Sequence, residues 1–383
     1  MSIQRSTKAP LPIPRQPLDI LLPIPRRTSN AHTLNLLRQL VDEILDKDAT
    51  YSITFSPILC PVPKAEGGGK NQLFTMKPHW WQLEDGSWEY RDAQRNPENA
   101  KPQGQEQLQL MAKTVHTLSL GILYIENSII RRKCIMKIEK LLKVFFIDID
   151  TRMEPQIRFS QCHPGENPKQ GNEHFVVAIR FLILVDQALI LCDEYLDERL
   201  VAQVKDWIRE QIIWMETSEQ GIKAREKPLL WYHAIMASHY RLIDRTNEIY
   251  AKTSFDQWFK IHDTPEKTFA DVMKNDNRRH RCLEDLQKLF IISDLTRIPG
   301  KKISTEIQTY LSDCSKYVKS VEKGPVEEPL EDNLRYFAKI VWFEKILNTW
   351  NNDNTGQIYE DEPDGKGWEG DWTTRMKILW GLI

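Results

Sequence analysis

The sequence lacks the patterns that mark several common enzyme and metal-binding classes. Its six cysteines are scattered and include no C-x-x-C pair, which argues against a zinc site or a dense disulfide framework. There is no G-x-S-x-G or H-E-x-x-H motif, and the triple glycine before Lys70 has the wrong spacing for a phosphate-binding loop. His233 and His239 are six positions apart, on different faces of a helix, which argues against a metal pair. We therefore predict no metal and no cofactor.

An excess of charge of one sign is also missing. The net charge of -2 over 383 residues gives no overall attraction to nucleic acid or to a membrane surface. The longest apolar run, Phe175–Cys192, contains Arg180, Asp186 and Gln187, so we expect it not to span a membrane. The N-terminus has no charged head followed by the apolar stretch of a signal peptide, which leaves a cytoplasmic location open.

Prolines recur in the first 30 residues. The pentapeptide LPIPR occurs at Leu11–Arg15 and again at Leu22–Arg26. Each proline fixes φ and removes a backbone donor, so this segment is not expected to join a helix. We predict a disordered tail over residues 1–30, with a proline-rich docking peptide as the alternative. Residues 31–383 are predicted to form one helical domain that acts as a monomer.

Helical periodicity covers most of the remaining chain, whereas period-2 alternation is almost absent. In Thr33–Leu45, and again from Gln105 to Ile122, apolar residues recur at i, i+3, i+4 and i+7. Phe175–Cys192 is apolar almost all round, which predicts a helix buried on every side. Further helices are expected at 134–145, 200–208, 283–292, 303–321 and 334–347. The predicted fold class is all-α, with antiparallel helix hairpins in a curved or closed ring.

Aromatic residues gather in a long segment without helical periodicity, residues 51–102. This segment holds Trp80, Trp81 and Trp88 among the twelve tryptophans of the chain. A loop of this length in a compact domain is usually functional or disordered, and its rings need a packing partner, which argues against disorder. Flat rings beside polar groups suit the C–H faces of sugars, whereas tryptophans at helical core positions are expected to be buried.

A second cluster lies in Asp206–Tyr250, where we expect a turn at Gly221 and a break at Pro228. Elimination across a uronic acid residue requires a group that neutralises the carboxylate, a base that removes the C5 proton and an acid that protonates the leaving oxygen. Arg, His and Asn suit the first task, and Tyr or His suits the proton transfers. A packed aromatic helix end is the alternative interpretation. The candidate residues of the cluster are His233, Tyr240, Arg241, Arg245 and Tyr250.

Several segments, in order and spacing, resemble the alginate lyase family of polysaccharide lyases. The resemblance implies an α/α toroid, an incomplete barrel of antiparallel helix hairpins with long aromatic-rich loops. It also implies an acidic polysaccharide as substrate and an extracellular or periplasmic location. The similar segments are KNQLFTMKPHWW (70–81), YRDAQRNPE (90–98), MAKTVHTLSL (111–120), TRMEP (151–155), FSQCHPG (159–165) and the stretch 207–238.

The resemblance also implies roles for individual residues. Arg245 matches an Arg-Thr segment of the family and would neutralise the substrate carboxylate. Tyr250, one position short of the family spacing, would act as the acid and as a base. His233 is our own candidate for a partial substitute, and an ordinary helix histidine is the alternative. The positions that resemble the sugar cleft or its covering loop are Gln161, Trp80, Trp81, Lys70, Tyr90 and Arg91.

The chain departs from the family at the centre of this pattern. The family reads Asn-Asn-His-Gly-Thr before Trp-Tyr, whereas here Leu229 and Leu230 precede Trp231. Either the chain is a lyase relative that has lost this segment, or the sequence comes from a gene model that omits coding segments at Leu229 and near Tyr240.

Cleavage of a uronic-acid polymer, of the alginate or glucuronan type, by β-elimination is the predicted function. Whether the missing Asn-His segment impairs that activity is left open. One alternative is a non-catalytic helical protein that binds acidic polysaccharide or another protein. A second alternative is a glycoside hydrolase on a similar toroid.

Overall fold

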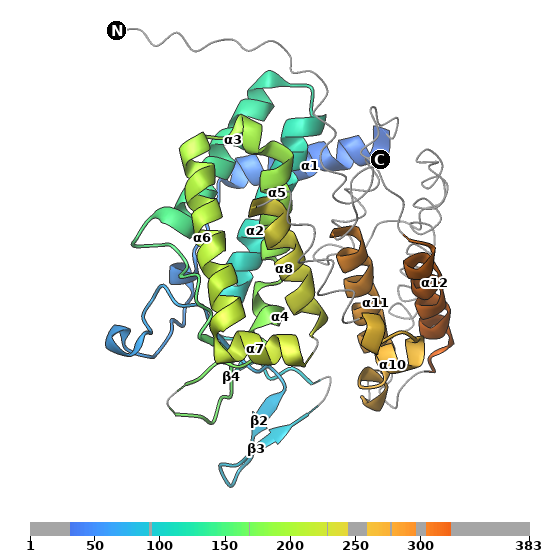
Figure 1. The fold of residues 1–383 in the computed structure, drawn as a ribbon. Helices are drawn as coiled ribbons and strands as arrows, with labels where there is room; N and C mark the ends of the chain where they lie inside the picture. Colours follow the sequence, from blue (N-terminus) through green and yellow to red (C-terminus); the bar gives the residue numbers. More distant parts are fainter. Residues whose placement is uncertain are drawn as a thin grey trace, which may run out of the picture.

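The computed structural model describes residues 31–322, except 92–93, 168, 228, 244–258, 276–277 and 296–303. This part of the chain is mostly helical (Figure 1), as the periodicity predicts. The predicted tail, the predicted helix at 334–347 and the closure of the helices into a toroid depend on residues outside this part.

Three inner helices form the centre of the molecule. α2 (Gly104–Tyr124) packs against α5 (Leu182–Cys192), and α5 packs against α8 (Leu230–Ile243). Every residue of α5 is buried, which explains why its sequence is apolar on all faces. The covering helices are α1 (Ala31–Lys47), α3 (Ser128–Leu142), α6 (Glu198–Thr217), α7 (Glu219–Glu226), α10 (Pro265–Phe269), α11 (Arg278–Leu295) and α12 (Thr305–Ser320).

The predicted single helix over Phe175–Cys192 is divided in two. α4 (Phe175–Ile179) ends at Arg180, and α5 begins at Leu182. Arg180 turns back to donate to the carbonyl of Val177 and lies over the ring of Phe181, 4.5 Å from its centroid. The side chain of Arg180 therefore occupies the break between the two helices.

Arg180, Asp186 and Gln187 do not make this stretch too polar to span a membrane, which corrects the expectation from the sequence. By length and apolar composition, Phe175–Tyr195 could cross a membrane, but 89% of its most apolar window is buried inside the protein. Burial of this kind is what the core helix of a globular protein shows.

The predicted turn at Gly221 is wrong, because Gly221 lies inside α7 and the chain turns at Ser218 instead. Ser218 ends α6 and caps α7, where its hydroxyl accepts from the Gly221 N–H at 3.1 Å. A Cβ on Gly221 would lie 1.9 Å from the carbonyl oxygen of Met215. Glycine is therefore required here by the close approach of the two helices.

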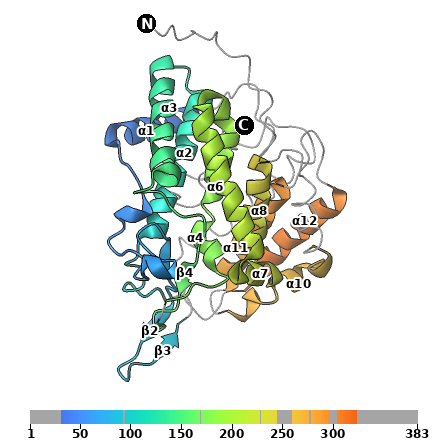
Figure 2. The same cartoon turned by 60° about the vertical axis from the view of Figure 1, so that its left-hand side comes forward.

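The structure also has four short strands, which the sequence does not predict, three of them in the aromatic segment 51–102. β1 (Phe74–Met76) pairs in parallel with β4 (Phe159–Cys162), and β2 (Trp80–Gln82) pairs antiparallel with β3 (Trp88–Tyr90). Each strand has only three or four residues, too few for an alternating pattern to be recognised. The β2–β3 hairpin projects from the end of the helices at which α7 and β4 lie (Figures 1 and 2).

A buried polar network connects three of the helices. Asp186 of α5 accepts hydrogen bonds from the hydroxyl of Ser238, at 2.6 Å, and from Nδ1 of His239, at 2.7 Å. Nε2 of His239 lies 2.9 Å from the side-chain oxygen of Gln211 on α6. Asp186, His239 and Gln211 are fully buried, so this network fixes α5, α6 and α8 relative to one another.

The six cysteines are all buried and free, as expected for reduced thiols at apolar positions. Burial raises the pKa of the Cys134 and Cys162 thiols to about 12. These thiols are therefore protonated and unreactive at neutral pH.

Candidate functional site

The β2–β3 hairpin presents its aromatic residues on both of its faces. Trp80 pairs with Tyr90, and Trp81 pairs with Glu89. Because side chains alternate along a strand, Trp80 and Tyr90 share one face while Trp81 lies on the other. The rings of Trp80 and Tyr90 meet edge to face with centroids 5.9 Å apart. Half-exposed Tyr90 leaves the outer edge of this aromatic surface open to solvent.

The hairpin is held against the loop that follows β4. The ring of Trp80 lies 4.3 Å from that of His163 in an edge-to-face arrangement. Trp88 packs beside Gly165, where an added Cβ would come within 2.5 Å of the indole nitrogen. The Pro-Gly pair of the FSQCHPG segment thus has a physical reason, since only glycine leaves room for Trp88.

Two asparagines fix the base of the hairpin. The side-chain amides of Asn96 and Asn99 both donate to the carbonyl of Trp80, at 2.9 and 2.8 Å. Asn99 also donates to the carbonyl of Lys77 at 3.0 Å. Asn96, within the YRDAQRNPE segment, and Asn99, directly after it, therefore position Trp80.

Arg91 and Trp81 lie together on the second face of the hairpin. The guanidinium of Arg91 lies over the Trp81 ring, 5.3 Å from its centroid, and its Nε donates to Glu89 at 2.6 Å. The indole N–H of Trp81 donates to the carbonyl of Gln94 at 3.3 Å. The structure brings together four of the predicted substrate-binding residues: Trp80, Trp81, Tyr90 and Arg91.

Gln161 lies in β4 with an unusual backbone conformation. Its φ of 57° falls in the left-handed region, which is sparsely populated by residues other than glycine and is often found at functional sites. Hydrogen bonds hold it there: its backbone N–H donates to the Thr75 hydroxyl at 2.8 Å, and Asn172 donates to its carbonyl. The side chain is only 9% exposed, so Gln161 lies beneath the surface that holds Trp80 and His163.

Lys70 is not part of the hairpin surface. Its ammonium faces Asp150 at 3.6 Å across solvent. The neighbouring Asn71 donates to the Arg152 carbonyl at 2.7 Å, which ties this turn to the segment 149–154. The structure thus places Lys70 beside the segment that follows α3.

Basic groups that the sequence argument missed surround the aromatic surface. Burial lowers the pKa of His163, and Lys77 and Lys169 lower it further against an opposing effect of Glu166. Burial likewise lowers the pKa of His174, again with a contribution from Lys77. The backbone N–H of Lys77 donates to the Cys162 carbonyl at 2.9 Å, which places Lys77 next to the segment that carries His163. The sequence signal for His163 is the His-Pro-Gly run within FSQCHPG.

The charge on this side of the molecule is partly balanced by Glu173. This carboxylate contacts the ammonium of Lys227 and lies 3.9 Å from Nε2 of His174. Burial opposes ionisation of Glu173, but the hydrogen bond and charge of Lys227, a backbone hydrogen bond and the charge of His174 together outweigh it, and the net pKa is lowered. Glu173 is therefore ionised at neutral pH and paired with the cations beside it.

His233 lies on α8 and is only 7% exposed. Burial, with smaller contributions from Arg225 and His262, lowers its pKa to about 4, so the imidazole is neutral at pH 7. Its ring contacts that of Tyr232 edge to face. A neutral imidazole can accept a proton, although its burial restricts access to a substrate. The other two candidate catalytic residues, Arg245 and Tyr250, lie outside the described residues.

The junction between α7 and α8 is short. The N–H of Leu229 donates to the Ala224 carbonyl at 3.1 Å, and the N–H of Tyr232 donates to the Leu229 carbonyl at 2.8 Å. Leu230 begins α8 and is buried. Leu229 packs against the core and Leu230 is buried within it, so the described residues of this junction are apolar.

No group of three or more His, Cys, Asp or Glu side chains suited to a metal ion occurs among residues 31–322 outside the gaps given above. The chemistry available in the described part comes from imidazoles, ammonium groups, a guanidinium and aromatic rings.

Comparison with known proteins gives a family and a fold. The sequence model of the alginate lyase family matches residues 61–233. An alginate lyase from Bacteroides ovatus has a similar structure, with a TM-score of 0.72 and 18% sequence identity over 92% of this chain and 93% of that one. No curated protein sequence matches. At this identity the structural likeness indicates the fold alone, and over residues 61–233, less than half of the chain, the sequence resembles the alginate lyase family.

Proposed function

We propose that the protein is a polysaccharide lyase that cleaves a uronic-acid polymer, of the alginate or glucuronan type, by β-elimination. The observation that carries the proposal is the aromatic surface of Trp80 and Tyr90, flanked by His163 and Lys77. An aromatic face binds the C–H surface of a sugar ring, and the nearby cation attracts its carboxylate. The match of residues 61–233 to the alginate lyase family supports the same substrate class.

In this proposal the substrate-binding residues and the catalytic residues come from different parts of the chain. The hairpin and His163 bind the polymer. Arg245 neutralises the carboxylate of the reacting unit and stabilises the enolate that forms when C5 loses its proton. Tyr250 protonates the leaving glycosidic oxygen, and neutral His233 is the candidate for proton removal.

The experiment is to incubate the full chain with alginate and with glucuronan and to follow two products. Elimination creates a carbon–carbon double bond conjugated with the carboxylate, which absorbs in the ultraviolet. Hydrolysis creates reducing ends without that absorbance. Ultraviolet absorbance on either polymer supports the lyase, whereas reducing ends alone would indicate a glycoside hydrolase.

A second candidate function is binding of acidic polysaccharide without catalysis. It is favoured by the closed α7–α8 junction, where Leu229 and buried Leu230 take the place of the Asn-His segment. Polymer binding that requires Trp80, with no product and no effect of Arg245→Ala, would select this function. We further propose an extracellular or periplasmic location and a monomeric state.

A further inference from the structure

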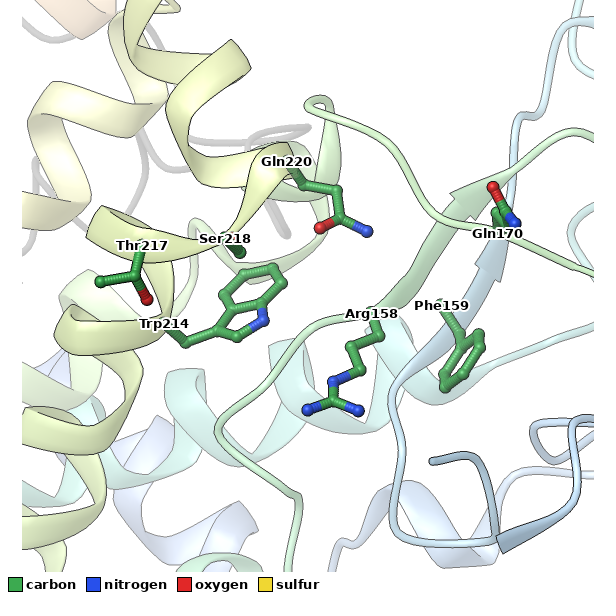
Figure 3. Close-up of a pocket in the computed structure, with 7 residues that line it drawn as sticks. All are labelled: Arg158, Phe159, Gln170, Trp214, Thr217, Ser218 and Gln220. Atoms are coloured by element: carbon green, nitrogen blue, oxygen red, sulfur yellow. The ribbon is translucent and has the colours of Figure 1, made fainter. Parts of the chain in front are cut away.

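A separate pocket opens between the end of α6, the start of α7 and the beginning of β4 (Figure 3). Its volume is about 400 Å³, within the range of small-molecule sites. It lies on the opposite end of β4 from His163, at Arg158 and Phe159. The residues that line it are Arg158, Phe159, Gln170, Trp214, Thr217, Ser218 and Gln220.

The pocket presents an indole donor that makes no hydrogen bond to the described residues of the protein. Trp214 is only 8% exposed, and in the described part of the chain its indole N–H makes no hydrogen bond. The other tryptophan of α6 differs, because Trp207 donates to the Met153 carbonyl at 2.7 Å. The Trp214 nitrogen itself remains open to solvent, and Figure 3 shows it on the side of the ring that faces Arg158. It can therefore donate to a ligand in the pocket.

Arg158 gives the pocket a positive charge that no carboxylate offsets. Among the described residues no acidic group forms an ion pair with Arg158, and none of the lining residues is acidic. The guanidinium lies against Gly67, where an added Cβ would be 2.7 Å from Nη1. This contact holds the charge at the rim of the pocket, where it is available to a ligand.

The remaining lining groups suit the hydroxyl groups of a sugar. Gln170 and Gln220 offer amides that can both donate and accept, and Figure 3 shows the Gln220 amide above Trp214 and Arg158. The hydroxyl of Thr217 is already committed to the Ile213 carbonyl at 2.7 Å. One guanidinium, one indole N–H and two amides therefore face a space bounded by aromatic rings.

We propose that this pocket is a second binding site for an acidic sugar, specifically a uronate unit or short uronate oligosaccharide. Arg158 binds the carboxylate, the Trp214 N–H donates to a sugar oxygen, and Gln170 and Gln220 bind hydroxyl groups. The choice of a uronate rests on the function proposed above. Neither Trp80 nor His233 lines the pocket, so the role we propose for it is to retain the polymer or its products.

The test is a titration of the full-length protein with a mannuronate trisaccharide, followed by tryptophan fluorescence. The ligand changes the tryptophan emission of the wild type and of Trp214→Phe, and the difference between these two changes is the signal of Trp214 in the pocket. For that signal we expect Arg158→Gln to raise Kd about tenfold, because a hydrogen-bonded charge pair is removed. Arg132→Gln, on exposed α3, is the matched control and should leave Kd unchanged. Neutral mannotriose should give no Trp214 signal.

The inference is overturned if Trp214→Phe keeps the full emission change, or if Arg158→Gln and Arg132→Gln have the same Kd. Ultraviolet absorbance of the unsaturated product, recorded on the same samples, separates this result from the proposed lyase function. Binding without product contradicts the lyase and leaves the pocket supported. Product with an unaltered Kd in Arg158→Gln contradicts the pocket alone.

Discussion

His233 is a buried histidine whose neutral form is built into the folded protein. Its pKa falls from 6.5 to about 4 because burial disfavours the charged imidazole. In the unfolded chain the same group titrates near its ordinary value. Between these two values the unfolded state binds more protons than the folded state, so stability rises with pH and is lost on acidification.

We expect the wild-type protein to lose about 3 kcal/mol of unfolding free energy through His233 as the pH falls from 6.5 to 4. His163 and His174 act in the same direction, so the measurement is a difference from His233→Gln, which stays neutral. Urea denaturation at several pH values gives both curves. Parallel curves for the two proteins would show that His233 is exposed or charged in the folded state.

Gly165 provides the space that seats Trp88 against the loop after β4. In Gly165→Ala the new methyl group displaces the indole, and the aromatic surface around His163 is rearranged. We expect alginate binding to weaken by about 1 kcal/mol, roughly fivefold in Kd, as for the loss of one aromatic contact. Affinity electrophoresis in alginate-containing gels measures the change. Gln82→Ala, an exposed change on the same hairpin, is the control, and equal mobility of the two variants would contradict this role.

The positions of some candidate binding residues could be predicted from the sequence, whereas those of others could not. Trp80, Trp81, Tyr90 and Arg91 come together because they belong to one hairpin, and local spacing suffices to predict that. Lys70 is close to them in sequence, but the turn at Asn71 directs it to Asp150. His163 meets Trp80 only through the packing of a distant loop on the hairpin, and no local pattern encodes such a contact.

At the scale of secondary-structure elements, α5, α6 and α8 are joined by a polar network in an otherwise apolar core. Asp186→Ala would leave Ser238 and His239 buried without their acceptor. We expect a loss of about 3–5 kcal/mol in unfolding free energy. Asp206→Ala on the exposed side of α6 breaks a surface pair and should cost less than about 1 kcal/mol.

Urea denaturation of both aspartate variants decides this point. A similar small loss in both would mean that the network does not hold the three helices together. A large loss only in Asp186→Ala would show that this carboxylate is required by its partners on α8.

Long helices were predictable because an apolar face repeats over several turns, as in α1, α2 and α12. The interruption between α4 and α5 was not predictable, because the stretch Phe175–Cys192 contains no proline or glycine to mark it. Strands β1 to β4 were missed since three or four residues carry no period. Their pairing joins segments more than 80 residues apart in the case of β1 and β4, and sequence patterns hold little information about such contacts.

At the scale of the whole molecule, the positive charge near Trp80 determines how strongly the protein attracts a polyanion such as alginate. The lowered pKa values of His163 and His174 leave these imidazoles neutral at pH 7. They gain protons only below their ordinary value of about 6.5, so positive charge beside Trp80 grows as the pH falls. We expect alginate to bind more tightly at pH 5 than at pH 7, and less tightly at high salt.

Isothermal titration with alginate at the two pH values measures this effect. The double variant His163→Asn, His174→Asn should lose most of the pH dependence while still binding at pH 7. A pH dependence that survives in the double variant would assign it to other groups.

The central claim is that the chain eliminates across a uronic acid unit. Its most direct measurement is ultraviolet absorbance of unsaturated product when the full-length protein is incubated with alginate and with glucuronan, in parallel with Arg245→Ala and with Arg132→Ala as a control. We predict absorbance with the wild type and the control, reduced at least about a hundredfold in rate in Arg245→Ala by loss of transition-state stabilisation. No absorbance on either polymer, or the same rate in both arginine variants, would contradict the claim.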